Sequence, residues 1–435
     1  MKIQNETRLI TLVLLTCTAG YLARGESVEK RVSIRERKNV PSACEGSGWS
    51  AGPDMPSTVV RAVGVYFQAN GKFYVMGGRA SDSPGSDLIH PFEYDPATNS
   101  WTTKSATYPD NQVNNMACSV LTDSGTPYIY CVGGSAAGQT TATDRMFRYD
   151  PIADTINSIP APWLGDSDGI TLPGGFTVSH NKLYILGGFQ INTAATDEIW
   201  EFTPGSNSWT LKNSHLDETL AFVPASTIGD LIFTAGGSFW NGTTLVEQID
   251  AFVYDPIADS IQGFDNIPRA TAETRALTFD TGSGEDMWVM GGGRNPPNPS
   301  NEVDVYDTSM FEWVLGPAFM TARRNFPTDT DGTNTIWLAG GYASDGVTPL
   351  SSMEIFCQAG ATPSPTPTQS PTVTPTPTAT TTPTATATAT ATPMGTRTPC
   401  VACTPRPRPT PAVRPSPSAP PSPHGTPRFT PVPRP

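Results

Sequence analysis

The sequence predicts an all-β protein whose folded body is a six-bladed propeller, and three observations carry this prediction. Gly-Gly pairs recur six times, 49 to 56 residues apart, and each pair follows a short apolar run. A second strand-like run follows each pair, and the body shows no helical periodicity. A repeat of about 50 residues built from short strands is typical of a ring of four-stranded blades. The pairs begin at Gly77, Gly133, Gly187, Gly236, Gly291 and Gly340.

The elements of one blade follow in a fixed order. An apolar strand precedes each Gly-Gly pair, as at residues 73–76, and one further strand lies upstream across a tight turn such as Asn70-Gly71. The strand after the pair ends, in five blades, in a turn such as Asp95-Pro96, where a side-chain acceptor and a fixed φ favour the reversal. A bulky residue such as Trp101 then opens the fourth strand.

The order Gly-Gly, Tyr-Asp-Pro, Trp resembles the kelch repeat family across residues 44–358. Two units carry Ile156 and Ile261 where the others carry Trp. The resemblance implies a ring closed by an N-terminal strand. The segment around Trp49 matches the end of the fifth unit around Trp313, so we expect it to supply the outer strand of the sixth blade.

Cysteine positions predict two disulfides in the body. Cys44 lies just before the expected closing strand and Cys357 ends its neighbour, so a Cys44–Cys357 bridge would lock the ring. Such a bridge would contribute about 5 kcal/mol in the chain-entropy account of disulfide stabilisation. Cys118 and Cys131 are placed symmetrically about Ser124-Gly125, which predicts a second bridge across a hairpin.

The N-terminal segment has the layout of a secretory signal peptide. Lys2 and Arg8 precede an apolar stretch that ends at Ala23 and is too short to span a bilayer. We therefore assign residues 1–23 to a signal peptide with an open cleavage point and residues 24–43 to a linker. We expect a monomer without a transmembrane segment, secreted or held on the extracellular side of the cell envelope.

Residues 359–435 have a different composition from the body. Pro, Thr, Ala and Ser dominate this tail, which cannot bury a core and is expected to be a disordered spacer or stalk. Cys400 and Cys403 lie in it, either paired with each other or linked outward. A lone CxxC without a second pair does not indicate a metal site.

Charge is distributed unevenly along the chain. The whole chain carries −13, residues 1–43 carry +4 and residues 359–435 carry +6, which leaves −23 on residues 44–358. So acidic a body argues against nucleic-acid binding, because phosphate contacts need a basic face.

The longer connections of the blades share one face of a propeller, and three arginines mark it. Arg61, Arg275 and Arg324 each precede their Gly-Gly pair by 16 residues, in blades that adjoin around the ring. They predict a crescent of guanidinium groups beside the central channel, suited to carboxylates or sulfates. The same arginines could instead pair with local acids and hold strands in place. The candidate ligand-binding residues are Arg61, Arg79, Arg275, Arg294, Arg323, Arg324, Trp240 and Tyr342.

Two functions remain open at this point. The first is non-catalytic binding of a protein or glycan partner with an anionic or polar group; the pair Arg323-Arg324 resembles the ligand-facing arginines of kelch adaptor proteins. The second follows from a six-bladed kelch relative that exchanges the anomers of an acidic sugar with a carboxylate and arginines. Glu273, or Asp217 with Glu218, would then supply the general acid and base.

Metal and cofactor chemistry is not indicated. Some kelch propellers resemble copper-radical oxidases, which need histidine and tyrosine ligands that converge near the axis. The body has only His90, His180 and His215, on three separate connections. We therefore predict no metal and no cofactor.

Overall fold

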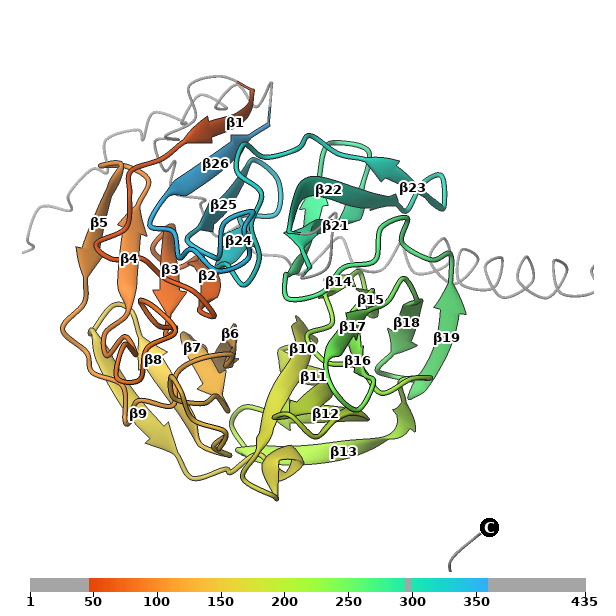
Figure 1. Ribbon diagram of the computed structural model, residues 1–435, viewed down its shortest axis with the longest axis horizontal. Coiled ribbons are helices and arrows are strands. Elements are labelled where there is room, and N and C mark those ends of the chain that lie inside the picture. Colours follow the sequence, from red (N-terminus) through yellow and green to blue (C-terminus); the bar gives the residue numbers. More distant parts are fainter. Residues whose placement is uncertain (1–46, 294–298, 359–435) are drawn as a thin grey trace, which may run out of the picture. The chain divides into compact units, whose positions relative to one another are not determined.

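The computed structural model describes residues 47–293 and 299–358, which form six four-stranded antiparallel sheets arranged in a ring about a central axis (Figure 1). Five sheets run from inner to outer strand in chain order, and the sixth takes its outer strand from the start of the described chain. A short 3-10 turn, η1 (Leu164–Asp166), is the only helical element of these residues. The predicted all-β, six-bladed propeller is confirmed. The predicted signal peptide, linker and tail lie outside the described residues.

The blades are numbered in chain order. From inner to outer strand, blade 1 has β2 (Val63–Phe67), β3 (Lys72–Met76), β4 (Phe92–Asp95) and β5 (Ser100–Thr103); blade 2 has β6 (Ala117–Asp123), β7 (Thr126–Val132), β8 (Met146–Asp150) and β9 (Thr155–Ile159); blade 3 has β10 (Thr171–Ser179), β11 (Lys182–Gln190), β12 (Ala194–Thr203) and β13 (Ser208–His215). Blade 4 has β14 (Ala225–Ile228), β15 (Leu231–Ala235), β18 (Ala251–Asp255) and β19 (Ser260–Phe264), with a hairpin of β16 (Ser238–Trp240) and β17 (Leu245–Glu247); blade 5 has β20 (Ala276–Asp280), β21 (Glu285–Gly292), β22 (Ser300–Asp307) and β23 (Glu312–Leu315); blade 6 has β24 (Thr328–Thr330), β25 (Thr335–Ala339), β26 (Met353–Cys357) and β1 (Gly48–Ala51).

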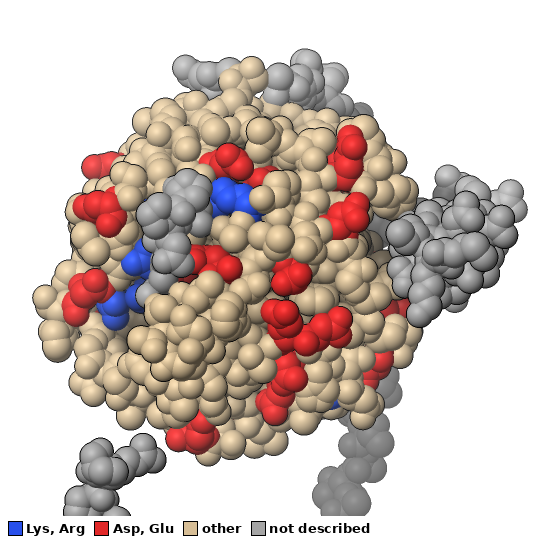
Figure 2. Space-filling view, turned by 45° about the vertical axis from the view of Figure 1, so that its right-hand side comes forward, with Lys and Arg blue, Asp and Glu red and all other residues tan. Residues whose placement is uncertain are grey.

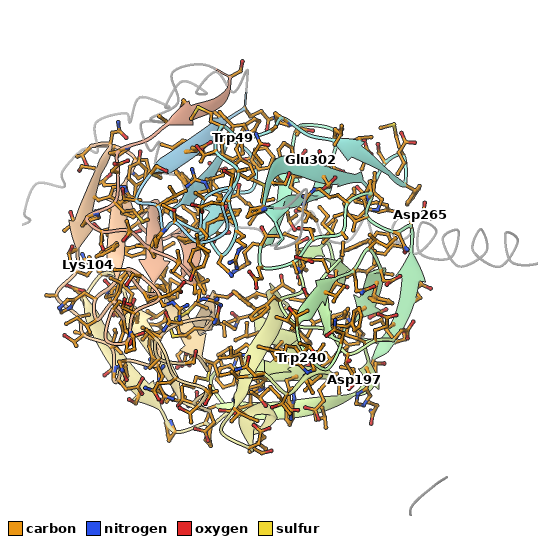
Figure 3. The ribbon with its side chains drawn as sticks, viewed as in Figure 1. Trp49, Lys104, Asp197, Trp240, Asp265 and Glu302 are labelled. Carbon is orange, nitrogen blue, oxygen red and sulfur yellow. A yellow bond between two sulfur atoms is a disulfide. The ribbon has the colours of Figure 1, made fainter. Side chains whose placement is uncertain are left out.

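The ring closes where the sequence predicts. Strand β1 pairs antiparallel with β26, so that Trp49 lies opposite Phe356. Figure 3 shows Trp49 at this junction, where its ring lies 5.4 Å from that of Phe356 and 5.7 Å from that of Phe319. One sheet therefore joins the first and last described strands of the propeller.

One disulfide is fully described. Cys118 on β6 and Cys131 on β7 are paired in register across the first hairpin of blade 2 and form the predicted bridge. Cys357 is also disulfide-bonded. Its predicted partner, Cys44, lies outside the described residues.

Aromatic pairs bridge all six interfaces between blades, which explains why aromatic residues recur in the repeat. Edge-to-face and stacked rings stabilise such contacts beyond the area they bury. The pairs, with their centroid distances, are Phe73–Trp337 (6.0 Å), Tyr74–Tyr149 (5.9 Å), Tyr130–Phe202 (5.8 Å), Tyr184–Tyr254 (6.2 Å), Phe233–Tyr306 (6.2 Å) and Trp288–Phe356 (5.6 Å).

The tryptophan of the repeat ties its blade to the preceding one. Each outer-strand indole Nε1–H donates to a backbone carbonyl just beyond the outer strand of the blade before it. The four bonds are Trp49 to Pro317 (2.7 Å), Trp101 to Pro53 (2.9 Å), Trp209 to Ala161 (3.1 Å) and Trp313 to Asp265 (2.7 Å).

Blades 2 and 4 lack the tryptophan and use a carboxylate for the same purpose. Asp154 of blade 2 accepts from the amide of Ser105 at 2.8 Å, and Asp259 of blade 4 accepts from the amide of Asn213 at 2.9 Å. Both aspartates also accept from the tyrosine hydroxyl of their own turn, Tyr149 and Tyr254, at 2.9 Å. The departures from the repeat are therefore compensated by a second kind of link between blades.

The Gly-Gly pairs lie where neighbouring backbones crowd together. Gly77 has a φ of +67° and Gly340 one of +62°, and a Cβ added to either would lie less than 3.0 Å from a carbonyl oxygen of the next blade, that of Val113 or Val59. Glycine is the residue that tolerates both conditions. The pairs therefore fix the close approach of successive blades near the channel.

Candidate functional site

The channel mouth is a small cavity to which all six blades contribute. Its volume is about 80 Å³. In five blades the chain reaches the mouth just before the inner strand, and in blade 3 it does so within β10. The residue that pairs with the second glycine of the Gly-Gly pair has a left-handed backbone in five blades: Arg61 (φ 60°), Asn115 (57°), Phe222 (50°), Glu273 (55°) and Asn325 (53°). Asn adopts this conformation readily, whereas Arg, Phe and Glu do so at a cost.

A chain of backbone hydrogen bonds joins these residues from blade to blade. The Asn115 amide donates to the Arg61 carbonyl (2.9 Å), and the Arg61 amide donates to the Asn325 carbonyl (2.9 Å). The Asn325 amide donates in turn to the Glu273 carbonyl (2.7 Å). Blade 3 has Pro173 at this point, which has no N–H to donate. The left-handed turn thus links blades 5, 6, 1 and 2 around the channel.

Tyr342 organises the arginines on the loop face. The residue is 1 % exposed, and its ring centroid lies 4.6 Å from the guanidinium carbon of Arg324 and 5.7 Å from that of Arg61. Its hydroxyl donates to Asp82 and accepts from Arg79 Nη2 at 3.2 Å and from Arg61 Nε at 3.4 Å. Tyr342 was predicted to face a ligand; buried in this way, it positions the arginines instead.

Carboxylates balance most of this positive charge. Arg79 pairs with Asp82, and Arg324 pairs with Glu273, which is 4 % exposed. Arg324 also donates through Nη2 to the Gly346 carbonyl at 2.6 Å. Burial lowers the pKa of the Arg61 guanidinium, but its interactions with Tyr342 and Glu273 more than offset this, and the net pKa is raised. Arg61, Arg79 and Arg324 are therefore held in a paired network.

Arg275 is in a different situation. Its guanidinium carbon lies 3.9 Å from the ring centroid of Phe176, on the opposite side of the mouth. Its Nε and Nη1 atoms are buried without a hydrogen-bond partner in the described structure. Burial lowers the pKa of Arg275 to about 10, a shift that Asp329 opposes, so the group is a cation at neutral pH. Of the predicted arginines that the structure describes, Arg275 has the most buried nitrogen atoms without a hydrogen-bond partner.

Two of the predicted ligand-binding arginines, Arg323 and Arg294, do not contribute to the described mouth. Arg323 is fully buried and donates to the carbonyls of Thr321, Gly340 and Ser352 and to Glu354 at 2.6 Å, so it has no surface to offer a ligand. Arg294 lies outside the described residues.

The 16-residue spacing does not place the three arginines of the predicted crescent at equivalent positions. Arg61, Arg275 and Arg324 share a 16-residue offset from their Gly-Gly pairs, yet the three occupy different positions in their blades. Strand pairing makes Glu273 of blade 5 and Asn325 of blade 6 the equivalents of Arg61. The offset fails because the hairpin that joins the mouth to the glycine pair differs in length between blades 1, 5 and 6. Sequence analysis did not connect Asn115, Phe222 and Asn325 to the mouth; an alignment by strand pairing would have found them.

Trp240 lies on β16, in the hairpin of blade 4 (Figure 3). Its ring packs 5.8 Å from that of Phe189, which in turn lies 5.6 Å from Phe222 at the mouth. These three residues belong to a larger apolar cluster that includes Leu172 of blade 3 and Leu245 of blade 4. Trp240 is half-buried there, so only part of its ring is available to a ligand.

Other candidate residues are dispersed. His90 donates from Nδ1 to the Ala106 carbonyl (2.9 Å), while His180 pairs with Asp230 (3.0 Å) and His215 with Asp197 (3.5 Å). Within residues 47–293 and 299–358, no group of three or more His, Cys, Asp or Glu residues could hold a metal ion. Asp217 and Glu218 are exposed and do not line the mouth, whereas Glu273 does.

Surface charge agrees with the acidic composition. Figure 2 shows acidic side chains scattered over one face of the propeller, with basic side chains gathered in a few small patches. No helix of the described part is both long and apolar enough to cross a membrane.

Known sequences match the chain through its repeats. A family model for the kelch motif matches residues 53–107. Kelch-like protein terF of Aspergillus terreus is 26% identical over 261 residues, covering 56% of this chain and 52% of the relative. Kelch repeat and BTB domain-containing protein 1 of cowpox virus is 24% identical over 257 residues, covering 58% and 41%. Kelch-like protein 35 of Mus musculus is 30% identical over 163 residues, covering 36% and 24%. The chain thus spans about half or less of the length of these relatives.

A solved structure shares the architecture. The structure titled "Structure of YjhT" aligns with a TM-score of 0.53 at 13% identity, covering 69% of this chain and 95% of that one. At this identity the similarity supports the fold alone.

Proposed function

The chain belongs to the kelch-repeat β-propellers, and from that premise we propose that it is a non-catalytic binding module for a protein or glycan partner. Kelch propellers generally bind protein partners, and the loops around the mouth offer a surface for one. The finer proposal is that the partner presents an anionic group to the channel mouth.

The observation that carries this proposal is the state of Arg275. Two of its guanidinium nitrogens are buried without a partner, and a buried donor left unpaired is costly. A carboxylate or sulfate oxygen at the mouth would satisfy them, and guanidinium groups match such anions in geometry and charge. A mouth of about 80 Å³ admits one such group rather than a whole sugar ring or residue. The body of the partner would therefore lie on the loops outside.

We further propose that the protein is secreted or displayed on the outer side of the cell envelope. The signal-peptide layout of residues 1–23 supports this location. The Cys118–Cys131 disulfide supports it independently, because such bonds persist mainly in oxidising compartments.

The test is an array of acidic and neutral glycans and of peptides with and without Asp and Glu, probed with the full-length protein. Wild type is expected to retain acidic probes, and Arg275→Ala to bind them at least about tenfold more weakly, as loss of a charge-assisted hydrogen bond implies. Arg61→Asn places at blade 1 the residue that blades 2 and 6 carry at this position, and it should also weaken binding of the acidic probes. The matched control is Arg148→Ala, which removes an arginine paired with Asp123 at the opposite end of a blade. Equal retention of acidic probes by wild type and Arg275→Ala would refute the proposal.

One observation favours a second candidate, a mutarotase acting on an acidic sugar. Glu273 is a buried carboxylate at the mouth that accepts from Arg324 and, at 3.0 Å, from Asn325, with Arg275 two residues away. A positioned carboxylate can act as general acid or base, and neighbouring arginines can hold the carboxylate of a sugar acid. The test is anomer exchange of N-acetylneuraminic acid followed by proton NMR, with Glu273→Gln as the inactive variant. Exchange no faster than in buffer eliminates this candidate.

A further inference from the structure

The opposite end of the central channel holds a second and larger cavity. Its volume is about 540 Å³, within the range of small-molecule pockets. Its rim includes Gln68 in the β2–β3 turn and Asp331 and Gly332 in the β24–β25 turn, so it opens away from the loops of the mouth. Arg275 lines both cavities and, with Phe176 beside it, separates them.

Hydroxyl groups line this lower cavity. Inner strands of blades 2 to 6 contribute them, namely Ser119, Thr177, Ser226, Thr227, Thr278 and Thr330. Part of the set is already engaged: Thr177 and Thr227 share a hydrogen bond of 3.0 Å, Thr278 donates to the Thr227 carbonyl at 2.7 Å, and Thr330 donates to the Thr335 carbonyl at 2.6 Å.

Ser226 stands apart from the engaged hydroxyls. The residue is 3 % exposed, lines the cavity, and its Oγ has no hydrogen-bond partner in the described structure. The adjoining blade supplies the Nε and Nη1 atoms of Arg275, which are likewise buried and unpartnered. Buried polar groups in proteins are nearly always paired, so Ser226 and Arg275 are unusual among the residues that line the cavity and would gain from a polar ligand placed against them.

An acceptor faces the same space. Asp329 on β24 lines the cavity and interacts electrostatically with Arg275. One carboxylate oxygen, Oδ2, accepts from the Tyr66 amide at 2.7 Å. Burial raises the pKa of Asp329, and Arg275 opposes that rise. A guanidinium donor, a hydroxyl and a carboxylate acceptor therefore border one cavity.

This combination selects the chemistry of the ligand. Asp329, Asp331 and Glu285 would repel an anion, and Arg275 would repel a metal cation. Adjacent hydroxyl groups on a sugar meet both requirements, because each hydroxyl can donate to a carboxylate and accept from a guanidinium. Val65, Val120 and Leu277 add apolar wall for the C–H face of a ring. We propose that the lower cavity binds a neutral mono- or disaccharide. Because Arg275 lines both cavities, this sugar would share that guanidinium with an anionic partner at the mouth.

Saturation-transfer NMR on the full-length protein tests the proposal. The probes are glucose, galactose, maltose and lactose, with glucuronate as the acidic match to glucose. Wild type is expected to give a saturable signal with at least one neutral sugar and none with glucuronate from this site. Ser226→Ala should weaken the affinity about threefold or more, as for one hydrogen bond, and Asp329→Asn about tenfold, as for a charged acceptor. Thr98→Ala, an exposed turn substitution, is the control.

The variants also separate the two proposals. Arg61→Asn should reduce binding of acidic probes at the mouth, while Ser226→Ala should reduce only neutral sugars. Thermal melting checks that Asp329→Asn folds. If Asp329→Asn does not fold, Ser226→Ala, which removes one oxygen atom, still tests the proposal. Absence of signal with every neutral sugar at tens of millimolar, or a signal unchanged in Ser226→Ala, would overturn the lower-cavity proposal. Neither result would affect the proposal of an anionic partner at the mouth.

Discussion

The two sides of the channel mouth use the same backbone position for opposite purposes. Blades 5, 6 and 1 place Glu273, Asn325 and Arg61 there, and a chain of backbone hydrogen bonds joins them. Blades 3 and 4 place Pro173 and Phe222 there, the latter packed against Phe189. The repeat therefore fixes the scaffold equally on both sides, while polar chemistry is confined to one of them.

Arg275 belongs to both sides. It is anchored in blade 5, yet its guanidinium lies over the Phe176 ring of blade 3 at 3.9 Å. Because the apolar side offers it no acceptor, two of its nitrogens remain unpaired. The contrast between the sides thus leaves Arg275 with two buried nitrogen atoms that no described group satisfies.

The largest expected effect comes from breaking the polar side. Glu273→Ala removes the partner of Arg324 and leaves a buried guanidinium uncompensated, so we expect a loss of about 3–5 kcal/mol in the free energy of unfolding. Phe222→Ala at the matched position of blade 4 removes a half-buried ring and should cost about 1–2 kcal/mol. Both substitutions leave alanine at a left-handed φ, so that strain cancels in the comparison. Urea unfolding measures both; equal losses would show that the two sides do not differ.

The glycine pairs test whether the scaffold is symmetric. Gly187 in blade 3 and Gly340 in blade 6 both have positive φ, and an added Cβ would lie less than 3.0 Å from a carbonyl oxygen of the next blade in each. We expect Gly187→Ala and Gly340→Ala to cost similar amounts, at least about 2 kcal/mol each, from backbone strain and crowding. Gly229→Ala, whose Cβ would meet open space, is the control for strain alone. A large difference in melting temperature between the first two would mean that the blades are not equivalent scaffolds.

Tyr342→Phe tests the hydrogen-bond network on the polar side of the mouth. It removes the hydroxyl that bonds Asp82, Arg79 and Arg61, and we expect a loss of about 1–2 kcal/mol at pH 7. Burial raises the pKa of Asp82, but the Tyr342 hydroxyl and the charge of Arg79 lower it more, so its folded pKa lies below the ordinary value. Stability from a depressed carboxyl pKa is present above the unfolded pKa and is lost as pH falls through the folded one.

The difference between wild type and Tyr342→Phe should therefore be constant above about pH 5 and shrink below about pH 4, where Asp82 becomes protonated. Melting temperatures of both proteins between pH 3 and pH 7 measure it. A difference that grew toward acid pH would contradict the assignment of Asp82 as the acceptor.

Periodicity was sufficient to predict the scaffold. The Gly-Gly, Tyr-Asp-Pro and Trp positions recur because each blade turns and meets its neighbours in the same way, and ring closure through Trp49 could be predicted from its match to Trp313. Cys118 and Cys131 were predictable as a pair for the same reason, since one hairpin sets their register.

The site was harder to predict because its residues meet across blades. Counting back from the glycines placed Arg275 near the mouth, where it lies, but made it equivalent to Arg61. A fixed offset assumes hairpins of equal length, and the hairpins of blades 1 and 5 differ in length. Arg323 is fully buried whereas Arg324 is 9 % exposed, although the two are neighbours in sequence. The pairing of Tyr342 with Asp82 joins blades 6 and 1 and leaves no local signal.

The smallest expected effect comes from converting the apolar side toward the polar one. Phe222→Asn places at blade 4 the residue that blades 2 and 6 carry at the same left-handed position. Asn is favoured there over Phe by the backbone, whereas removal of the half-buried ring loses apolar contact, so the two effects oppose each other and the net change should stay within about 1 kcal/mol. Urea unfolding measures the change. A loss as large as that of Phe222→Ala would mean that packing of the apolar cluster, rather than the left-handed backbone, determines which residue this position accepts.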